Sequence, residues 1–394
     1  MSSRDRLAQR RRAVARRRRN ALIAVAVVAS LAGVVVGAGA GAGAGGGDST
    51  GGPPPSATCP PNVASSPKRL AGAMLMVRME DTATDELLRF ARHGELGGVI
   101  LFPSSGVAPS VLADQVGKLA QAARKAGYPE PLVAIDQEGG DVKRLPDEPP
   151  DIAPSAIAKA GGAQAARAQG LVTGNALSRL GIDVDLAPVL DLGEPDSFVS
   201  SRTFGDDPSQ VAGLGLAFAD GLADADVAAT AKHFPGLGLA TDDTDAGPST
   251  VDASRADLAP GLEPFRAAIG ASVPLIMVAN ATYPAYDAAR PASVSPKLIG
   301  GLLRDELGYD GVVVTDDLGA GALAGAGIDE AEAAVEAARA GADLLLFALD
   351  DGSAARRALV RAVRSEAIDS PRLIESCTRL ARLRAGLVTP TGAQ

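Results

Sequence analysis

Charged side chains follow several apolar segments of this 394-residue chain at the point where each segment ends. Asp136 and Glu138 follow "PLVAI", Lys232 and His233 stand at the end of "VAATAKHF", and Asp316 follows "GVVVT". A polar side chain at the end of a buried strand is costly to desolvate unless it is paired or used in function. The recurrence of such ends predicts a functional site that is assembled from several strands.

The residue types limit the chemistry of this site. The only histidines are His93 and His233, which excludes a multi-histidine metal centre, and no calcium loop of recognisable spacing is present. The lack of a GxSxG motif argues against a Ser-His-Asp hydrolase. What is abundant is carboxylate, together with Lys232, Arg144 and Arg202, and this is the equipment of glycoside hydrolysis. We expect neither a metal nor a cofactor.

The stretch 231–247, "AKHFPGLGLATDDTDAG", places Asp242, Asp243 and Asp245 within four residues. The glycines around this acidic cluster suggest a hinged loop that closes over a substrate. The alternative is a solvated acidic turn that follows a buried strand.

Eight short, apolar, strand-like segments recur along the chain from residue 69 onward, and alanine-rich stretches of helical spacing lie between them. Continuous apolar segments suit parallel strands that are buried on both faces. The eight are "AGAMLMVRM" from Ala71, "LGGVILF" from Leu96, "PLVAIDQ" from Pro131, "IDVDLAPVLDL" from Ile182, "VAATAKHF" from Val227, "PLIMVANA" from Pro274, "GVVVTDDL" from Gly311 and "ADLLLFAL" from Ala342. They predict an α/β fold, a single (β/α)8 TIM-type barrel, because a doubly wound sheet usually has fewer strands and would carry a GxGxxG turn after the first strand. The functional groups should then meet at the carboxyl ends of the strands.

The N-terminus has the order of an export signal. Nine arginines and one acid give residues 1–20 a formal charge of +8 in a chain of net charge −9, so the remainder carries −17. Residues 21–44 are uncharged, largely apolar and long enough to cross a bilayer, and they predict a signal peptide or an uncleaved signal anchor, with a buried core helix as the alternative. We expect a flexible Gly/Pro-rich linker over 45–67, the barrel over 68–388 and a tail over 389–394.

Export has consequences for the cysteines and for the partners. An exported chain sits in an oxidising compartment, so Cys59 and Cys377 are expected to form a disulfide that ties the start of the domain to its last helix, with two free thiols as the alternative. The acidic charge beyond residue 20 argues against nucleic acid as a partner. The membrane is a partner if the N-terminal segment stays uncleaved.

Five motifs, "GGVILF", "IDQEGGDVKRL", "SSRTFG", "AKHFPGLG" and "GVVVTDDLGA", resemble in order and spacing those of glycoside hydrolase family 3, and specifically of its single-domain bacterial β-N-acetylglucosaminidases. The resemblance extends over residues 69–386. It implies that Asp316 is the catalytic nucleophile and that Asp317 is a neighbour or a helix cap. It also implies a set of residues that hold the sugar of the substrate: Asp136, Arg144, Arg202, Lys232 and His233.

Three residues near this expected sugar site have alternative roles. Lys232 could form a Schiff base, as in barrel aldolases, although the surrounding motif favours an ammonium group that binds hydroxyl groups. His233 could be a packed imidazole at the end of the barrel. Glu138 is expected to be a supporting or structural group, because the two glycines that follow it mark a tight turn.

The loop after the fifth strand departs from the family pattern. The family has "KHFPGHG" followed by an Asp-Ser-His triplet whose histidine is the general acid/base, whereas this chain has Leu237 and the triplet Asp243, Thr244, Asp245. In one interpretation Asp245 replaces the histidine, and carboxylates crowded around it raise its pKa above the usual value of about 3.9. In a second, Asp243 takes this role and Asp245 supports it. In a third, the protein has lost efficient hydrolysis and binds cell-wall sugar as a pseudoenzyme.

The resemblance implies a retaining exo-glycosidase that removes terminal β-linked N-acetylglucosamine through a covalent glycosyl-enzyme. With the export signal, it implies an enzyme that is secreted or anchored on the outer side of the membrane and acts on peptidoglycan fragments. A β-glucosidase-type activity on the same barrel is the alternative for the sugar.

Overall fold

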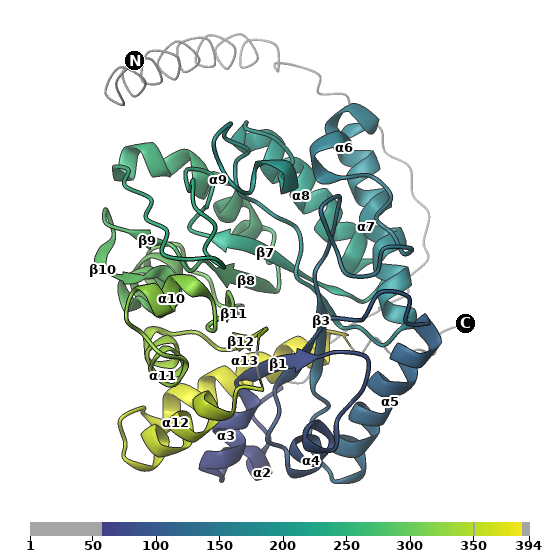
Figure 1. Ribbon diagram of the computed structural model, residues 1–394, viewed down its shortest axis with the longest axis vertical. Coiled ribbons are helices and arrows are strands. Elements are labelled where there is room, and N and C mark those ends of the chain that lie inside the picture. Colours follow the sequence, from purple (N-terminus) through teal and green to yellow (C-terminus); the bar gives the residue numbers. More distant parts are fainter. Residues whose placement is uncertain (1–56, 350, 388–394) are drawn as a thin grey trace, which may run out of the picture. The chain divides into compact units, whose positions relative to one another are not determined.

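Eight parallel strands form the centre of the computed structural model, which describes residues 57–349 and 351–387 (Figure 1). Their order around the sheet is β11-β8-β7-β6-β3-β2-β1-β12. Their bounds are β1 Leu75–Met79, β2 Gly98–Leu101, β3 Leu132–Ile135, β6 Val184–Asp185, β7 Ala228–Phe234, β8 Leu275–Val278, β11 Val312–Thr315 and β12 Leu345–Phe347. A parallel bridge between Val314 and Leu344 joins β11 to the segment that leads into β12, so the barrel is nearly closed. The predicted (β/α)8 barrel is confirmed, with each of the eight expected strands in place.

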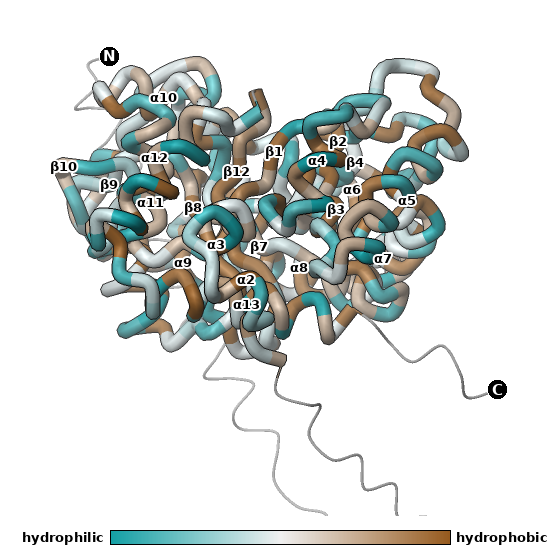
Figure 2. Tube along the Cα trace, turned by 90° about the horizontal axis from the view of Figure 1, so that it is seen from below, coloured by the Kyte–Doolittle hydropathy of each residue, from teal (hydrophilic) through white to brown (hydrophobic). Residues whose placement is uncertain are grey.

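The strands bury both of their faces because most of their residues are apolar and alternate side chains point to opposite sides. Polar residues such as Asp185, Lys232 and Thr315 stand at or near the carboxyl ends of their strands. Met76 on β1, Ile100 on β2 and Leu346 on β12 belong to a cluster of buried side chains that fills the inside of the barrel. Val77 and Val99 belong to the larger cluster between the strands and the surrounding helices. Figure 2 shows the same arrangement, with hydrophobic residues gathered on the strands and hydrophilic residues on the surrounding helices and loops.

Helices follow the strands and cover the outside of the barrel (Figure 1). Their bounds are α4 Asp85–His93, α5 Pro109–Lys125, α6 Pro154–Ala160, α7 Gly162–Arg179, α8 Pro208–Ala223, α9 Arg255–Gly270, α10 Gly321–Gly325, α11 Glu330–Ala340, α12 Ser353–Arg364 and α13 Ser370–Leu387. The helix α4 illustrates how the sequence sets these limits. The side chain of Thr84 accepts a hydrogen bond from the amide of Leu87 at the start, and Gly94 ends the helix in a left-handed conformation at φ 67°.

Shorter strands and helices lie in the connections between the main strands and helices of the barrel. Two antiparallel hairpins follow β3 and β8, and a helix with π-type hydrogen bonding precedes β11. Their bounds are β4 Gln137–Gly139, β5 Val142–Lys143, β9 Thr282–Tyr283, β10 Asp287–Pro291, η1 Ser200–Arg202, η2 Ala292–Val294 and η3 Lys297–Glu306.

Folded structure begins earlier than the sequence predicts. The expected linker over 45–67 is wrong for its last residues, because the helix α2 Pro61–Ala64 and the start of α3 Pro67–Ala73 lie within it. The physical reason is burial, since Cys59 is 7% and Val63 2% exposed against the barrel. Cys59 forms a disulfide with Cys377 of α13, which closes a separation of 318 residues.

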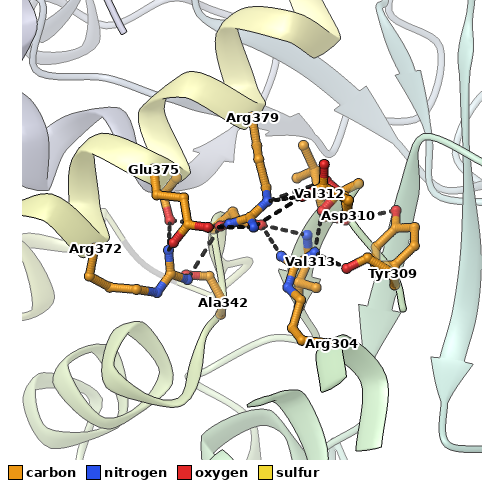
Figure 3. Close-up of polar contacts among 12 residues, drawn as sticks. Arg304, Tyr309, Asp310, Val312, Val313, Ala342, Arg372, Glu375 and Arg379 are labelled. Atoms are coloured by element: carbon orange, nitrogen blue, oxygen red, sulfur yellow. Dashed lines mark hydrogen bonds and ion pairs between the residues drawn. The ribbon is translucent and has the colours of Figure 1, made fainter. Parts of the chain in front are cut away.

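A buried charge cluster fastens α13 to the amino ends of β11 and β12. Asp343, which is fully buried, accepts hydrogen bonds from Arg304 of η3 at 2.5 Å, from Arg372 at 3.3 Å and from Arg379 at 3.4 Å. The amide of Val313 on β11 also donates a hydrogen bond to Asp343 Oδ2, at 3.0 Å. Figure 3 shows the three arginines converging between Val313 and Ala342. This cluster lies at the end of the barrel opposite to the carboxyl ends of the strands.

Within residues 57–387, position 350 aside, no helix is both long and apolar enough to cross a membrane. The expected signal or anchor segment over 21–44 lies outside the described residues, as do the basic region over 1–20 and the tail over 389–394.

Candidate active site

Four of the five residues expected to hold a sugar form one network with Glu138. The ammonium group of Lys232, at the end of β7, lies 2.8 Å from Asp136 Oδ1 and 2.6 Å from Glu138 Oε1. Arg202 donates from Nε to Glu138 Oε2 at 2.8 Å and from Nη2 to Oε1 at 2.6 Å. Arg144 Nη2 stands 3.6 Å from Asp136 Oδ2. Glu138 therefore joins two cations that come from distant parts of the chain.

The charges of this network fix its protonation. Burial alone would raise the pKa of Glu138, but the charges of Lys232 and Arg202 outweigh it and lower this pKa to about 2. Burial would likewise lower the pKa of Lys232, and the charges of Asp136 and Glu138 outweigh it, so this pKa is raised. A Schiff-base nucleophile must be a neutral amine, which this environment disfavours. The arrangement suits an ammonium group that donates hydrogen bonds.

His233 is held by one buried carboxylate. Its Nδ1 lies 2.7 Å from Oδ2 of Asp191, which is fully buried and also accepts hydrogen bonds from the amides of His233, at 3.3 Å, and Leu237, at 2.7 Å. Because a carboxylate accepts, Nδ1 carries a proton, and in the neutral form of the ring Nε2 is left as an acceptor. Leu237 is 1% exposed, so at this position the chain has a packed side chain that offers no proton donor.

The acidic loop after β7 is latched onto α10. The amide of Gly321 donates to the carbonyl of Asp245 at 3.0 Å, and the amide of Ala322 donates to the carbonyl of Thr244 at 3.0 Å. A Cβ atom on Gly321 would stand 2.7 Å from the carbonyl carbon of Ala246, so only glycine permits this approach. Since α10 begins five residues after Asp316, the latch connects the loop of Asp245 to the loop of Asp316.

The Asp245 side chain is exposed to solvent and surrounded by other carboxylates. The pKa of Asp245 is raised to about 6. Partial burial is the largest cause, and the negative charges of Asp316, Asp243 and Asp317 add to it. His233 lowers this pKa, but by less. Water screens these effects, because more than a third of the residue is accessible. The charge of Asp316 contributes to this raised pKa, so the two carboxylates are within electrostatic range of each other. The sequence predicts crowding by Asp242, Asp243 and Asp316; Asp316 and Asp243 do raise this pKa, together with Asp317, whereas Asp242 is not among the main causes.

Asp316 stands at the end of β11 and is partly exposed. Its amide donates to the carbonyl of Val278 on β8 at 2.9 Å, and its Oδ1 accepts from the amide of Asp317 at 2.9 Å. Asp317 has a different position, because its Oδ1 accepts from the amide of Ala348 after β12, at 3.0 Å. Asp317 therefore ties β11 to the segment that follows β12.

Two buried groups near these residues were not singled out by the sequence. Asp185 at the end of β6 accepts from the amide of Gln137 at 3.0 Å, its Oδ2 has no hydrogen-bond partner, and burial raises its pKa well above the usual value. The hydroxyl of Tyr283 on β9 donates to the carbonyl of Gly236 at 3.1 Å. Asp185 lies inside "IDVDL", a segment predicted only as a strand, and no local signal distinguishes it.

The described part of the chain contains no group of three His, Cys, Asp or Glu residues that could hold a metal ion.

Residues 69–383 match the family model described as the glycosyl hydrolase family 3 N terminal domain. The chain belongs to glycosyl hydrolase family 3. This family 3 chain is 34% identical to an uncharacterized secreted glycosyl hydrolase of Arthroderma benhamiae, over 78% of its own length and 89% of that protein. It is also 34% identical to a beta-hexosaminidase of Stenotrophomonas maltophilia, over 64% of its own length and 77% of that protein.

Solved structures give the same result for this family 3 chain. A family 3 beta-N-acetylglucosaminidase from Paenibacillus sp. superposes with a TM-score of 0.78 at 36% identity, covering 83% of this chain and 64% of that chain. A beta-N-acetylhexosaminidase from Beutenbergia cavernae superposes with a TM-score of 0.74 at 30% identity, covering 82% of this chain and 98% of that chain. Family membership makes the protein a glycoside hydrolase.

Proposed function

We propose that this glycoside hydrolase is a retaining exo-β-N-acetylhexosaminidase that removes terminal β-linked N-acetylglucosamine. The observation that carries the proposal is geometric: main-chain hydrogen bonds from Gly321 and Ala322 hold the loop of Asp245 against the segment that follows Asp316, at the carboxyl end of β11. The names of the relatives support the sugar, because they are a beta-hexosaminidase and beta-N-acetylglucosaminidases.

The two carboxylates would act in succession. An oxygen of ionised Asp316 attacks the anomeric carbon, the bond from that carbon to the leaving oxygen breaks, and protonated Asp245 gives its proton to the leaving oxygen. In the second step Asp245 takes a proton from water, the water oxygen bonds to the anomeric carbon, and Asp316 leaves. A pKa near 6 supports this double role, because Asp245 can then hold a proton in the first step and accept one in the second.

The cation network would bind the sugar in the position that Asp316 attacks. Asp136 keeps 14% of its side chain exposed and Arg144 keeps 39%, so both can reach hydroxyl groups, while Lys232 is held between two carboxylates. Glu138 would keep Lys232 and Arg202 in place without touching the substrate. His233, with Nδ1 fixed by Asp191, would present Nε2 to a sugar hydroxyl.

The compartment and the source of the sugar are part of the same proposal. The arginine-rich region over 1–20, followed by the apolar segment over 21–44, supports export, and so does the secreted relative. An exported hexosaminidase would meet peptidoglycan fragments, either as a secreted enzyme or as one anchored by an uncleaved segment. Fractionation of cells that express the full chain, with sequencing of the mature N-terminus, tests both: a cytoplasmic protein would contradict export.

Hydrolysis of an aryl N-acetyl-β-glucosaminide by the wild type and by Asp316→Asn and Asp245→Asn variants tests the catalytic roles. We expect turnover by the wild type and a loss of at least about a thousandfold in Asp316→Asn, because the covalent step needs an ionised carboxylate. Proton NMR of the first product should show the β-anomer. The α-anomer would contradict retention, and sugar binding without turnover would select the pseudoenzyme.

Leaving groups and sugars separate the finer alternatives. An activated nitrophenol needs little protonation, so loss of Asp245 should reduce hydrolysis of a natural disaccharide more than that of a nitrophenyl glycoside. If Asp243→Asn shows this pattern and Asp245→Asn does not, Asp243 is the acid. Faster hydrolysis of an aryl β-glucoside than of the N-acetylglucosaminide would select the β-glucosidase alternative.

A further inference from the structure

A groove of about 420 Å³ lies on the outer wall of the barrel, where residues of α3, α4 and α12 meet. None of its lining residues stands at the carboxyl end of a strand, so it is separate from Asp316 and the sugar-binding network. What distinguishes the groove is its cations, which are Lys68, Arg89, Arg356, Arg357 and Arg361.

The positive charge of this groove is not neutralised by its own acids. Glu86 and Glu95 are its two acidic lining residues, and Glu86 is 3.0 Å from Arg89. In the part of the chain described here, Lys68, Arg357 and Arg361 have no carboxylate within ion-pair distance. The groove therefore has an excess of positive charge on a chain whose formal net charge is −9. Like charges gathered in a concave surface attract ions of opposite sign.

The floor of the groove is a buried guanidinium with unused donors. Arg356 is 8% exposed and stacks on the ring of Phe90, with 3.7 Å between the guanidinium carbon and the ring centroid. Its Nη1 donates to the carbonyl of Glu95, whereas its Nε and Nη2 have no hydrogen-bond partner. A buried donor without an acceptor is unfavourable, by about 1–3 kcal/mol. Both nitrogens are buried from solvent, so an acceptor in the groove would relieve this penalty once the guanidinium had turned toward it.

We propose that this groove is a binding site for a phosphate-type oxyanion. Arg357 and Arg361 are exposed and lie one turn apart on α12, so they make the first contacts with the anion. Arg356 lines the same groove, and when its guanidinium turns toward the anion its unpartnered Nε and Nη2 donate in the forked geometry that matches phosphate oxygens. The phosphate belongs either to a single phosphate group on a small molecule or to one of many along an anionic polymer.

Calorimetric titration of the full chain at low ionic strength tests the site, with inorganic phosphate and a short polyphosphate chain as probes. We expect saturable binding of phosphate by the wild type and at least tenfold weaker binding by the Arg357→Gln/Arg361→Gln double variant. Polyphosphate that binds more than tenfold tighter than phosphate identifies a polymer as the source, and equal affinities identify a single group. Both results support the site, whereas no saturable binding of either probe overturns it.

Control variants separate the groove from general charge effects. Arg364 is exposed on the same helix and does not line the groove, so Arg364→Gln should bind phosphate as the wild type does. Equal weakening in Arg364→Gln and in the double variant would contradict a defined site. Arg356→Lys keeps the charge and removes the forked nitrogens, and it should also bind more weakly. Hydrolysis of the aryl glycoside should be unchanged in the double variant, so failure of this site and failure of the proposed activity are distinguishable.

Discussion

The backbone amide of Gly321 donates a 3.0 Å hydrogen bond to the backbone carbonyl of Asp245, and this bond joins the loop after β7 to the loop after β11. Asp245 lies in the first of these loops and Asp316 at the start of the second. The position of Asp245 relative to Asp316 therefore depends on main-chain contacts, and the side chains themselves need not touch. A second glycine extends the contact, because a Cβ on Gly325 would stand 2.2 Å from Cγ of Pro248.

Replacing Gly321 with alanine should move Asp245 away from Asp316. The new methyl group would stand 2.8 Å from the Asp245 carbonyl oxygen and 2.7 Å from the carbonyl carbon of Ala246, so the loop has to shift. We expect kcat/KM for the aryl glycoside to fall by about 10- to 100-fold, because a displacement of about 1 Å is enough for such a loss. Steady-state kinetics of Gly321→Ala measures this.

Gly213→Ala is the matched control for this variant. Gly213 lies within α8 and a Cβ there meets nothing within 4 Å. Alanine should leave kcat/KM unchanged and stabilise the helix by up to about 1 kcal/mol. Wild-type kinetics in Gly321→Ala would show that the latch does not position Asp245.

The pH dependence of hydrolysis should report Asp245. As the acid, this carboxyl group has to be protonated, and its pKa is raised to about 6, so kcat/KM should fall as the pH rises above about 6. Asp245→Asn should abolish this alkaline limb. Asp245→His should move the limb to higher pH, because histidine ordinarily titrates near 6.5 and the charge of Asp316 favours its protonated form.

Asp242→Asn is the control for the pH profile, since Asp242 is exposed and lies in the same loop. It should keep the limb of the wild type. An unchanged limb in Asp245→Asn would assign the ionisation to another group, and the profile of Asp243→Asn then shows whether Asp243 is that group.

Removing the charge of Glu138 should destabilise the protein and weaken substrate binding together. Its carboxylate is 1% exposed and accepts from both Arg202 and Lys232. Glu138→Gln leaves Lys232 with Asp136, and it leaves Arg202 with no carboxylate of the described residues within ion-pair distance. We expect the free energy of unfolding to fall by about 3–5 kcal/mol and KM to rise. Urea denaturation and steady-state kinetics measure the two effects.

The pH dependence of the free energy of unfolding is a second test of the role of Glu138. The pKa of Glu138 is lowered from its usual 4.5 to about 2, so its contribution is present above pH 4.5 and is lost as the pH falls toward 2. Glu138→Gln should lack this part of the acid unfolding. Glu130→Gln, which removes an exposed pair with Arg124 at 2.6 Å, should change stability by at most about 1 kcal/mol. Equal effects of the two variants would contradict a special role for Glu138.

The strands and their polar ends were predictable because both are local features. An apolar segment followed by Asp136, Lys232 or Asp316 is visible within ten residues of sequence, and the barrel topology then brings the ends together. The family resemblance added the expected roles, which no local pattern contains.

What escaped prediction depends on partners far apart in the chain. The close approach of Gly321 to Ala246 spans 75 positions, and nothing around "GAGALAG" shows which glycine is needed. In the sequence Asp185 resembles any other polar residue of a strand, and only the structure shows that its buried Oδ2 has no hydrogen-bond partner. The helix α2 lies in a proline- and serine-containing stretch, "CPPNVASSPK", that is typical of a linker, and Cys59 and Val63 are buried against the rest of the domain.

Asp343 should be required for stability but not for catalysis. Its carboxylate holds Arg304, Arg372 and Arg379 at the amino ends of the strands, and it is fully buried (Figure 3). Asp343→Asn would leave three arginines without their common counter-charge, so we expect the free energy of unfolding to fall by about 3–5 kcal/mol.

Asp310→Asn is the control, because Asp310 contacts Arg379 at 3.2 Å but is 76% exposed, and its loss should cost at most about 1 kcal/mol. Urea denaturation gives the folded fraction of Asp343→Asn. When kcat/KM is calculated for the folded molecules alone, it should equal that of the wild type, because Asp316 lies at the opposite end of β11. If kcat/KM falls under conditions in which the variant is fully folded, the charge cluster instead influences the active site through the strands.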